Sequence, residues 1–228
     1  MKLSVTSASV VALLTTGVLA APHDQQPLQT GKNFNLIDEL KKAEIIPTVL
    51  DPFQPFLSVN VTWKRASASI GNTVKPKKLK KTPDIHLIDD LLDVVFPWHD
   101  DESLPQLTLA LTDPDAKSRD NPIWSEMCHW IVTEVPLTAP NGTSVAKTFK
   151  EVMPYKAPGP PPKTGKHRYV FAALAPRNGT HEVLNLTVPA DRQHWGYGEV
   201  RRGLRDWAEE NGLVVIGANF IYAQDTKQ

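Results

Sequence analysis

The sequence lacks the features on which several classes of protein depend. Cys128 is the only cysteine, so no disulfide can form within the chain and a disulfide-stapled scaffold is excluded. Lysine plus arginine and aspartate plus glutamate each number 25, so no excess of one sign attracts the whole chain to nucleic acid. The 20 prolines favour turns over a helical bundle, and an apolar content of 41% is too high for a wholly disordered chain.

The first twenty residues have the pattern of a secretory signal peptide. Lys2 supplies a positive charge, residues 10–19 are mainly apolar, and Val18 and Ala20 suit the cleavage positions. A membrane anchor is the alternative, but the apolar run is shorter than the roughly 20 residues that a span needs. We therefore expect secretion or delivery to the vacuole, with no transmembrane segment left after cleavage.

Sequons for N-linked glycosylation agree with this route. Four Asn-x-Thr triplets begin at Asn60, Asn141, Asn178 and Asn185. One triplet is common by chance, but four behind a signal peptide favour a secreted glycoprotein.

The rest of the chain predicts one domain that is mainly β. We expect a signal peptide over 1–20, an N-terminal segment with a short helix over 21–50, and a β-sandwich domain over 51–228. The helix should run from Leu36 to Ile46, between a capping Asn35 and Pro47, and a second amphipathic helix should cover 199–211. Alternating or apolar runs predict strands at 56–63, 106–112, 128–135, 169–175 and 214–223. Strands separated by long proline-rich loops predict an antiparallel β-sandwich with a few short peripheral helices.

Two adjacent segments carry opposite charge. Seven basic residues and no acids lie between positions 64 and 81, namely Lys64, Arg65, Lys75, Lys77, Lys78, Lys80 and Lys81. Seven acids and no Lys or Arg lie between positions 84 and 102. The basic run could bind phosphate or anionic lipid. The simpler interpretation is that the two runs are solvated loops that neutralise each other.

A first candidate for the functional site lies around residues 111–132. Asp113 should end a strand, because Pro114 lacks the N–H that continues a ladder. Strict alternation would place His129 and Ile131 on one face of the next strand, with Trp130 and Val132 on the other. Asp113 and His129 could then meet at the mouth of a pocket, while Cys128 is expected to be a small buried apolar residue.

A second candidate lies at residues 158–171. Gly159 and Gly165 flank three prolines and Thr164, and such a loop can point backbone N–H groups at an anion. His167 then begins a strand. One aspartate, two histidines and exposed amides suit a phosphoryl or carboxylate group. Alternatively, the histidines and prolines are structural, and Asp115 and Arg168 form an internal ion pair that braces the two loops.

These two segments resemble the signature blocks of the phosphatidylethanolamine-binding protein (PEBP) family. The first family block, Asp-Pro-Asp-x-Pro-Ser-Arg, is similar to residues 113–119 and is followed here by Glu126 and His129. The second, Gly-Pro-Pro and then Gly-x-His-Arg-Tyr-Val, is similar to residues 159–161 and 165–170. The resemblance is specific over 105–175 and looser over 53–85 and 203–224. It points to a secreted, fungal-type member.

The resemblance implies a β-sandwich with a small anion pocket at one end. Carried over position by position, the pocket residues are Asp113, His129, Pro160, Pro161, His167 and Tyr169, with Asp115 and Arg168 supporting them. Lys117 replaces a usual proline and Met127 a common aromatic residue. Residues 86–104 look like an insertion, and the C-terminal helix of some animal members is missing.

Three functions follow as hypotheses. The first is a non-enzymatic protein, without cofactor or metal, that binds a phosphoryl or other anionic group such as a phospholipid head group. The second is inhibition of a serine carboxypeptidase by protein–protein contact, as in some fungal members, through 86–104 and the N-terminal helix. The third is a metal-dependent enzyme, because two histidines and one aspartate match a facial triad. A serine hydrolase is disfavoured because no nucleophile-elbow motif is present.

Overall fold

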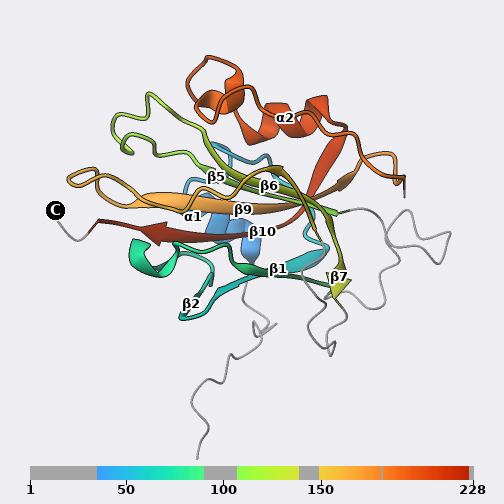
Figure 1. Cartoon of the computed structure of the whole chain (residues 1–228), viewed down its shortest axis with the longest axis horizontal. Helices are drawn as coiled ribbons and strands as arrows, with labels where there is room; N and C mark the ends of the chain where they lie inside the picture. Colours follow the sequence, from blue (N-terminus) through green and yellow to red (C-terminus); the bar gives the residue numbers. More distant parts are fainter. Residues whose placement is uncertain (1–34, 90–106, 139–148, 181, 226–228) are drawn as a thin grey trace, which may run out of the picture. The chain divides into compact units, whose positions relative to one another are not determined.

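A computed structural model describes residues 35–89, 107–138, 149–180 and 182–225 (Figure 1). The chain divides into two units, and all of these residues belong to the second, Asn35–Gln228. The predicted signal peptide, Asn141 and positions 90–104 of the predicted insertion lie outside the described residues. The expected boundary between residues 50 and 51 stays a prediction. No helix in the described ranges is long and apolar enough to cross a membrane.

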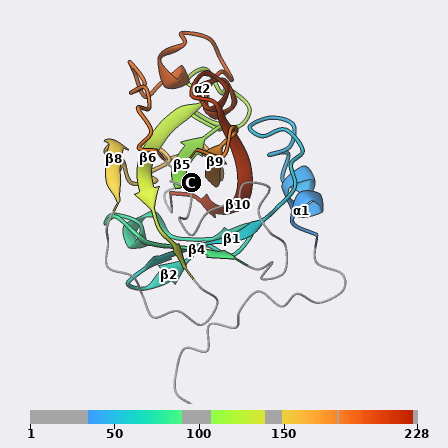
Figure 2. The ribbon, with the colours of Figure 1, turned by 90° about the vertical axis from the view of Figure 1, so that its right-hand side faces the viewer.

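Two β-sheets pack face to face, and the helices α1 and α2 lie beyond the larger one (Figure 2). The smaller sheet has the order β2-β1-β4-β7, with β1 (Leu57–Trp63), β2 (Ala66–Ser67), β4 (Asp84–Asp89) and β7 (Leu137–Thr138). The larger has the order β3-β10-β9-β5-β6-β8, with β3 (Asn72–Thr73), β5 (Leu107–Asp113), β6 (Met127–Val135), β8 (Lys150–Met153), β9 (His167–Pro176) and β10 (Leu213–Ala223). Neighbouring strands are antiparallel except in the pairs β3–β10 and β4–β7. The helical segments are α1 (Leu36–Lys42), α2 (Leu204–Glu210) and the 3₁₀ turns η1 (Pro76–Lys78) and η2 (His194–Gly196).

The larger sheet is covered on both faces, which explains its apolar strands. On β9, Phe171 and its alternate neighbours belong to the core between the sheets, whereas Val170 and its alternate neighbours pack under the helices. The outer core includes Leu40 of α1 and Trp207 of α2, both almost fully buried. Because both faces exclude water, every residue of β9 is buried and the strand lacks polar alternation. The expected fold class, a mainly antiparallel β-sandwich with short peripheral helices, is confirmed.

The predicted elements are present, with shorter helices than the sequence indicates. The first helix ends at Lys42 rather than Ile46, and Glu44 beyond it adopts a left-handed φ of 53° that no α-helix continues. The second helix begins only at Leu204, after Arg201 with a φ of 67°. The acidic run is not simply a loop, because its first residues, Asp84 to Asp89, form β4 and pair with β1. That strand was missed because Asp84 and Asp89, its first and last residues, were counted with the acidic run.

Gly217 allows the two sheets to approach at one point. A Cβ at this position would lie 2.5 Å from Leu57 Cδ1 and 2.7 Å from the Leu57 carbonyl oxygen. Beside it, the Phe56 N–H donates a hydrogen bond of 2.8 Å to the Ile216 carbonyl. The register of β10 against β9 also shifts between Val215 and Gly217. The absence of a side chain at Gly217 therefore allows β1 to pack closely on β10.

Replacing Gly217 with alanine should lower stability by about 1–3 kcal/mol, as expected for overpacking against backbone that cannot move away. Urea unfolding of the purified protein measures this change. Gly159→Ala is the matched control, because the nearest atom to its added Cβ is 3.8 Å away. Equal midpoints for the two variants would contradict this account of the sheet contact.

Candidate functional site

A small cavity of about 180 Å³ opens at one end of the larger sheet. Its walls contain all six residues that the sequence predicted for the pocket, namely Asp113, His129, Pro160, Pro161, His167 and Tyr169. They come from the end of β5, the start of β6, the loop before β9 and the start of β9. Antiparallel pairing brings these positions together, although they span more than fifty residues of sequence. Their role in binding a ligand stays a prediction.

A bulge in β6 directs His129 toward this cavity. Leu111 pairs with Trp130 and Thr112 pairs with Cys128, so His129 is an extra residue without a partner on β5. Cys128 and Ile131 both belong to the outer core, whereas the His129 ring contacts Tyr169 of the inner core at 5.2 Å between ring centroids. The expectation that His129 and Ile131 share a face is therefore wrong. The bulge breaks strict alternation and turns His129 to the side of Trp130.

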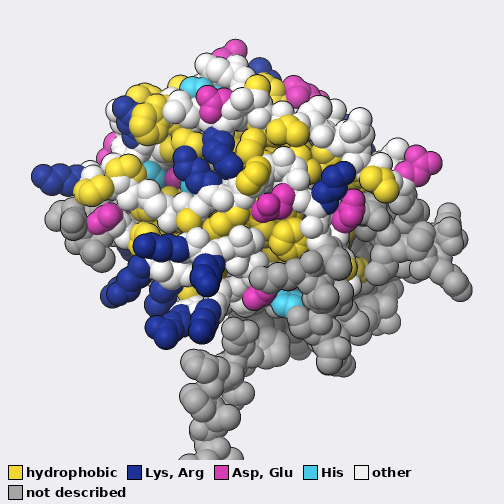
Figure 3. Space-filling view, viewed as in Figure 1, with side chains coloured by type: hydrophobic (Ala, Val, Ile, Leu, Met, Phe, Trp, Pro, Cys, Tyr) yellow, Lys and Arg dark blue, Asp and Glu magenta, His cyan; other side chains and the backbone are white. Residues whose placement is uncertain are grey.

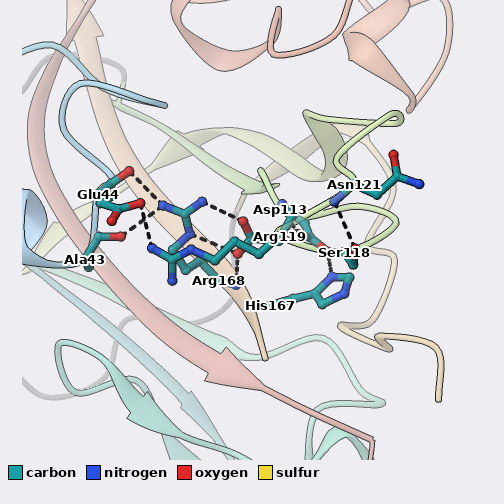
Figure 4. Close-up of polar contacts among 9 residues, drawn as sticks. Ala43, Glu44, Asp113, Ser118, Arg119, Asn121, His167 and Arg168 are labelled. Atoms are coloured by element: carbon teal, nitrogen blue, oxygen red, sulfur yellow. Dashed lines mark hydrogen bonds and ion pairs between the residues drawn. The ribbon is translucent and has the colours of Figure 1, made fainter. Parts of the chain in front are cut away.

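Asp113 and His167 form the floor of the cavity and hold each other in place (Figure 4). His167 Nδ1 lies 2.9 Å from Asp113 Oδ2, and His167 Nε2 lies 3.0 Å from the Thr164 hydroxyl. That hydroxyl donates to the Pro161 carbonyl at 2.7 Å, so it accepts from His167. Both ring nitrogens of His167 are therefore engaged, one by the Asp113 carboxylate and the other by the Thr164 hydroxyl. The pair thus ties the proline loop to the end of β5, and neither nitrogen of His167 is left for a ligand.

His129 and Tyr169 are buried polar groups in their neutral forms. Burial lowers the pKa of His129, and the nearby Asp113 carboxylate only partly opposes this effect. Its Nδ1 lies 2.7 Å from the Lys156 carbonyl, which can only accept, so Nδ1 carries the proton. Burial, followed by the charge of Asp113, raises the pKa of Tyr169 well above its usual value. The unprotonated Nε2 of His129 therefore remains available as an acceptor in the cavity wall.

The rim of the cavity is cationic. Lys117 and Lys156 both line it, and neither forms an ion pair with a carboxylate in the described part of the chain. Lys117 Nζ lies 4.4 Å above the Trp124 ring. Lys117 was noted in the sequence as a departure from the family block, but Lys156 and Trp124 were missed. Lys156 reaches the site because its N–H donates 2.7 Å to the His129 carbonyl, a contact without a local sequence signal.

Asp115 and Arg168 form the ion pair that the sequence suggested, and both side chains are buried. Two guanidinium nitrogens of Arg168 lie 2.9 and 2.5 Å from the two carboxylate oxygens, and its backbone N–H donates 2.8 Å to the same carboxylate. Its remaining nitrogen donates to the carbonyls of Ala43 and Glu44 at the end of α1, at 2.9 and 2.7 Å. Arg168 is 4% exposed and Asp115 1%. The pair braces both signature segments and also fixes α1.

The arrangement gives the metal-enzyme hypothesis no support. Asp113 bonds to His167 and to the Asp115 N–H, and His129 bonds to Lys156, so the three groups do not converge on one point. No cluster of three or more His, Cys, Asp or Glu side chains within the described ranges could hold a metal.

Two further titratable groups near the site lie outside the cavity. Glu126 is buried, and desolvation raises its pKa to about 8, although it accepts a hydrogen bond of 3.0 Å from the Thr112 hydroxyl. The fully buried Cys128 has a pKa raised to about 12 for the same reason, so it is the small buried thiol that the sequence suggested.

Three of the four sequons fall on described residues. Asn178 and Asn185 are exposed after β9, where Asn178 Oδ1 accepts 3.2 Å from the Thr180 N–H. Asn60 is half-buried on β1. Whether any of them carries a glycan stays a prediction.

Comparison with known proteins agrees with this fold. The family model described as "Phosphatidylethanolamine-binding protein" matches residues 90–221. The Carboxypeptidase Y inhibitor of Saccharomyces cerevisiae is 31% identical, over 82% of this chain and 94% of that protein. A crystal structure of carboxypeptidase Y inhibitor complexed with its cognate proteinase has a TM-score of 0.72 and 30% identity, over 84% of this chain and 95% of that one. A PEBP structure from Plasmodium vivax shares the fold, with a TM-score of 0.63 at 20% identity.

Removing the buried carboxylate should be costly. Asp115→Ala leaves the Arg168 guanidinium buried without its counter-charge, and we expect a loss of about 3–5 kcal/mol in the free energy of unfolding. Urea unfolding followed by tryptophan fluorescence measures it. Lys42→Ala, which breaks the exposed Lys42–Glu39 pair, is the control and should leave the midpoint nearly unchanged. Similar losses in both variants would show that burial of the Asp115 pair is not the cause.

Proposed function

The chain belongs to the phosphatidylethanolamine-binding protein family, and from this premise we propose that it is a non-catalytic protein that inhibits a serine carboxypeptidase. The observation that carries the proposal is the extent of its similarity to the yeast inhibitor, which covers nearly the whole of that protein. An inhibitor acts through its surface, so similarity along the entire sandwich matters more than one shared pocket.

One described segment is suited to contact a peptidase. The helix α1 presents Asp38, Lys41 and Lys42 to solvent, while its buried side rests on the outer core. Arg168 donates hydrogen bonds to the carbonyls of Ala43 and Glu44 at the C-terminal end of α1. These bonds fix the position of the helix on the sheet. A rigid recognition element loses little conformational entropy on binding, which favours affinity.

The test is an inhibition assay with purified carboxypeptidase Y and a blocked dipeptide substrate. We expect peptidase activity to fall as the full chain is added. The double variant Asp38→Ala/Lys41→Ala should weaken inhibition by about tenfold, roughly 1.4 kcal/mol of contact energy. Lys150→Ala on β8 is the control for a distant exposed charge and should inhibit like the unmodified chain. Undiminished peptidase activity in excess protein would remove the proposal.

A second candidate function rests on the cavity itself, which suits a small phosphoryl or carboxylate group such as a phospholipid head group. Lys117 and Lys156 at the rim supply the positive charge, because the prolines on both sides of Gly159 in the adjoining wall have no N–H to donate. His129 Nε2 can accept a hydrogen bond from a protonated phosphate oxygen or an ammonium group. This function is compatible with inhibition, because it uses the interior of one end of the sandwich. It requires no cofactor.

Nuclear magnetic resonance of the histidine rings tests this second function. Titration with phosphorylethanolamine or inorganic phosphate should shift the ring signals of His129, while His194, which lies outside the cavity, should not respond. Because burial lowers the pKa of His129 from 6.5, its charged form appears only at more acidic pH, and anion affinity should rise as pH falls below 6.5. Equal shifts at both histidines, or none, would contradict the pocket assignment.

The expected location is the secretory pathway, including the vacuole. The signal-peptide pattern and the sequons support it, and Asn178 and Asn185 are exposed enough to carry glycans. In that compartment the chain would meet a carboxypeptidase without entering the cytosol.

A further inference from the structure

A second hollow, of about 400 Å³, lies between α2, the segment 49–53 and the paired ends of β9 and β10. It is distinct from the cavity of the candidate site, because the two lie at opposite ends of β9. His167 begins this strand and lines the cavity, whereas Arg177 follows its last residue and lines the hollow. The ten residues of β9 span roughly 30 Å.

The floor of this hollow is apolar. It is formed by the buried side chains of Val49, Leu50, Leu204 and Leu213, and the half-buried Phe53 adds an aromatic ring. Figure 3 shows Lys and Arg side chains gathered near β2, whereas beside α2 apolar side chains reach the surface among charges of both signs. The volume of the hollow falls within the range of about 300–1,000 Å³ that is usual for small-molecule sites.

Arg205 of α2 joins two walls of the hollow. Its Nε lies 3.3 Å from Asp51 Oδ2, and its Nη2 donates a hydrogen bond to the Pro47 carbonyl. The segment that leads from α1 to β1 is thereby tied to α2. The shape of the hollow is therefore held by contacts within the protein.

Two unlike charges line this hollow without neutralising each other. Arg177 and Glu209 are both exposed, and neither forms an ion pair in the part of the chain that the structure describes. Their backbones meet at Gly212, whose carbonyl accepts 2.7 Å from the Arg177 N–H and whose N–H donates 3.0 Å to the Glu209 carbonyl. A guanidinium and a carboxylate so placed leave room between them for a molecule that carries both charges.

We propose that the hollow binds a short peptide that has free ends and apolar side chains, such as a dipeptide. The peptide carboxylate accepts two hydrogen bonds from the planar Arg177 guanidinium, and its ammonium group donates to Glu209. Its side chains cover the apolar floor. A free amino acid carries the same charges but covers less of that floor, so it binds more weakly. The proposal holds whether or not the chain inhibits a peptidase.

Isothermal titration calorimetry of the full chain with leucyl-leucine tests the proposal. Glycylglycine keeps both charges without apolar side chains, N-acetyl-leucyl-leucine lacks the ammonium group, leucyl-leucine amide lacks the carboxylate, and leucine lacks the second residue. The variants of the hollow are Arg177→Gln and Glu209→Gln. The matched controls, Arg65→Gln and Glu134→Gln, remove the same charges from exposed positions outside the hollow. The melting temperature of each variant verifies folding.

We expect leucyl-leucine to bind more tightly than the other four compounds. Each variant of the hollow should lose about tenfold to a hundredfold in affinity for it, as expected for a hydrogen bond between charged groups. Arg177→Gln should lose little more when the ligand is the amide, and Glu209→Gln little more when it is the acetylated peptide, because each pair of changes removes the same contact. The controls should bind as the unmodified chain does.

Four results would overturn the proposal. The first is no binding of leucyl-leucine, and the second is equal binding of glycylglycine, which would leave the apolar floor without a role. The third is an equal loss of affinity in the hollow and control variants. The fourth is binding of leucine or of the acetylated peptide as tight as that of leucyl-leucine, which would replace the peptide with a free amino acid or with an apolar carboxylate.

Discussion

A single buried guanidinium connects the parts of this protein that lie far apart in sequence. Arg168 neutralises Asp115 in the first signature segment, belongs itself to the second, and holds the last carbonyls of α1. A charge at 4% exposure persists only because each of these partners satisfies it. The floor of the cavity rests on the same contacts, since the Asp115 N–H donates to Asp113, which in turn holds His167. The seat of the N-terminal helix and the shape of the cavity therefore depend on one set of hydrogen bonds.

Within the cavity, residues of the same type have different tasks. His167 directs both nitrogens into the protein and serves as wall and brace. The bulge in β6 turns His129 inward, and its Nδ1 donates a hydrogen bond to the Lys156 carbonyl. Its Nε2 remains available to a ligand. Lys117 and Lys156, which lie in loops rather than in strands, complete the rim of the cavity. The part of the site that can respond to a ligand is therefore smaller than the set of residues that builds it, and its charge comes from loops.

Much of this could be predicted from the sequence, for identifiable reasons. The long strands β5, β6, β9 and β10 can be recognised in the sequence as apolar runs, because both of their faces are buried. Asp113, His129 and His167 were found because proline and glycine mark the loops beside them. The direction of the His129 side chain could not be predicted, because a β-bulge adds one residue to a strand and leaves no mark in its amino-acid composition. Lys156 and the strands β3 and β7 were also missed, because their contacts or pairings join distant segments. The strand β2 forms a tight hairpin with β1, but it has only two residues and so shows no periodicity.

The lysines around β2 and β3 have a consequence apart from any ligand. Each of these strands ends a sheet and offers unpaired backbone groups, which is where a second copy of a chain can add a strand and begin to aggregate. Here both edge strands are only two residues long, and the segments beside them carry unneutralised positive charge, so an identical chain arriving at this edge is repelled. The positive charges beside these edge strands therefore keep two molecules of the protein from joining there.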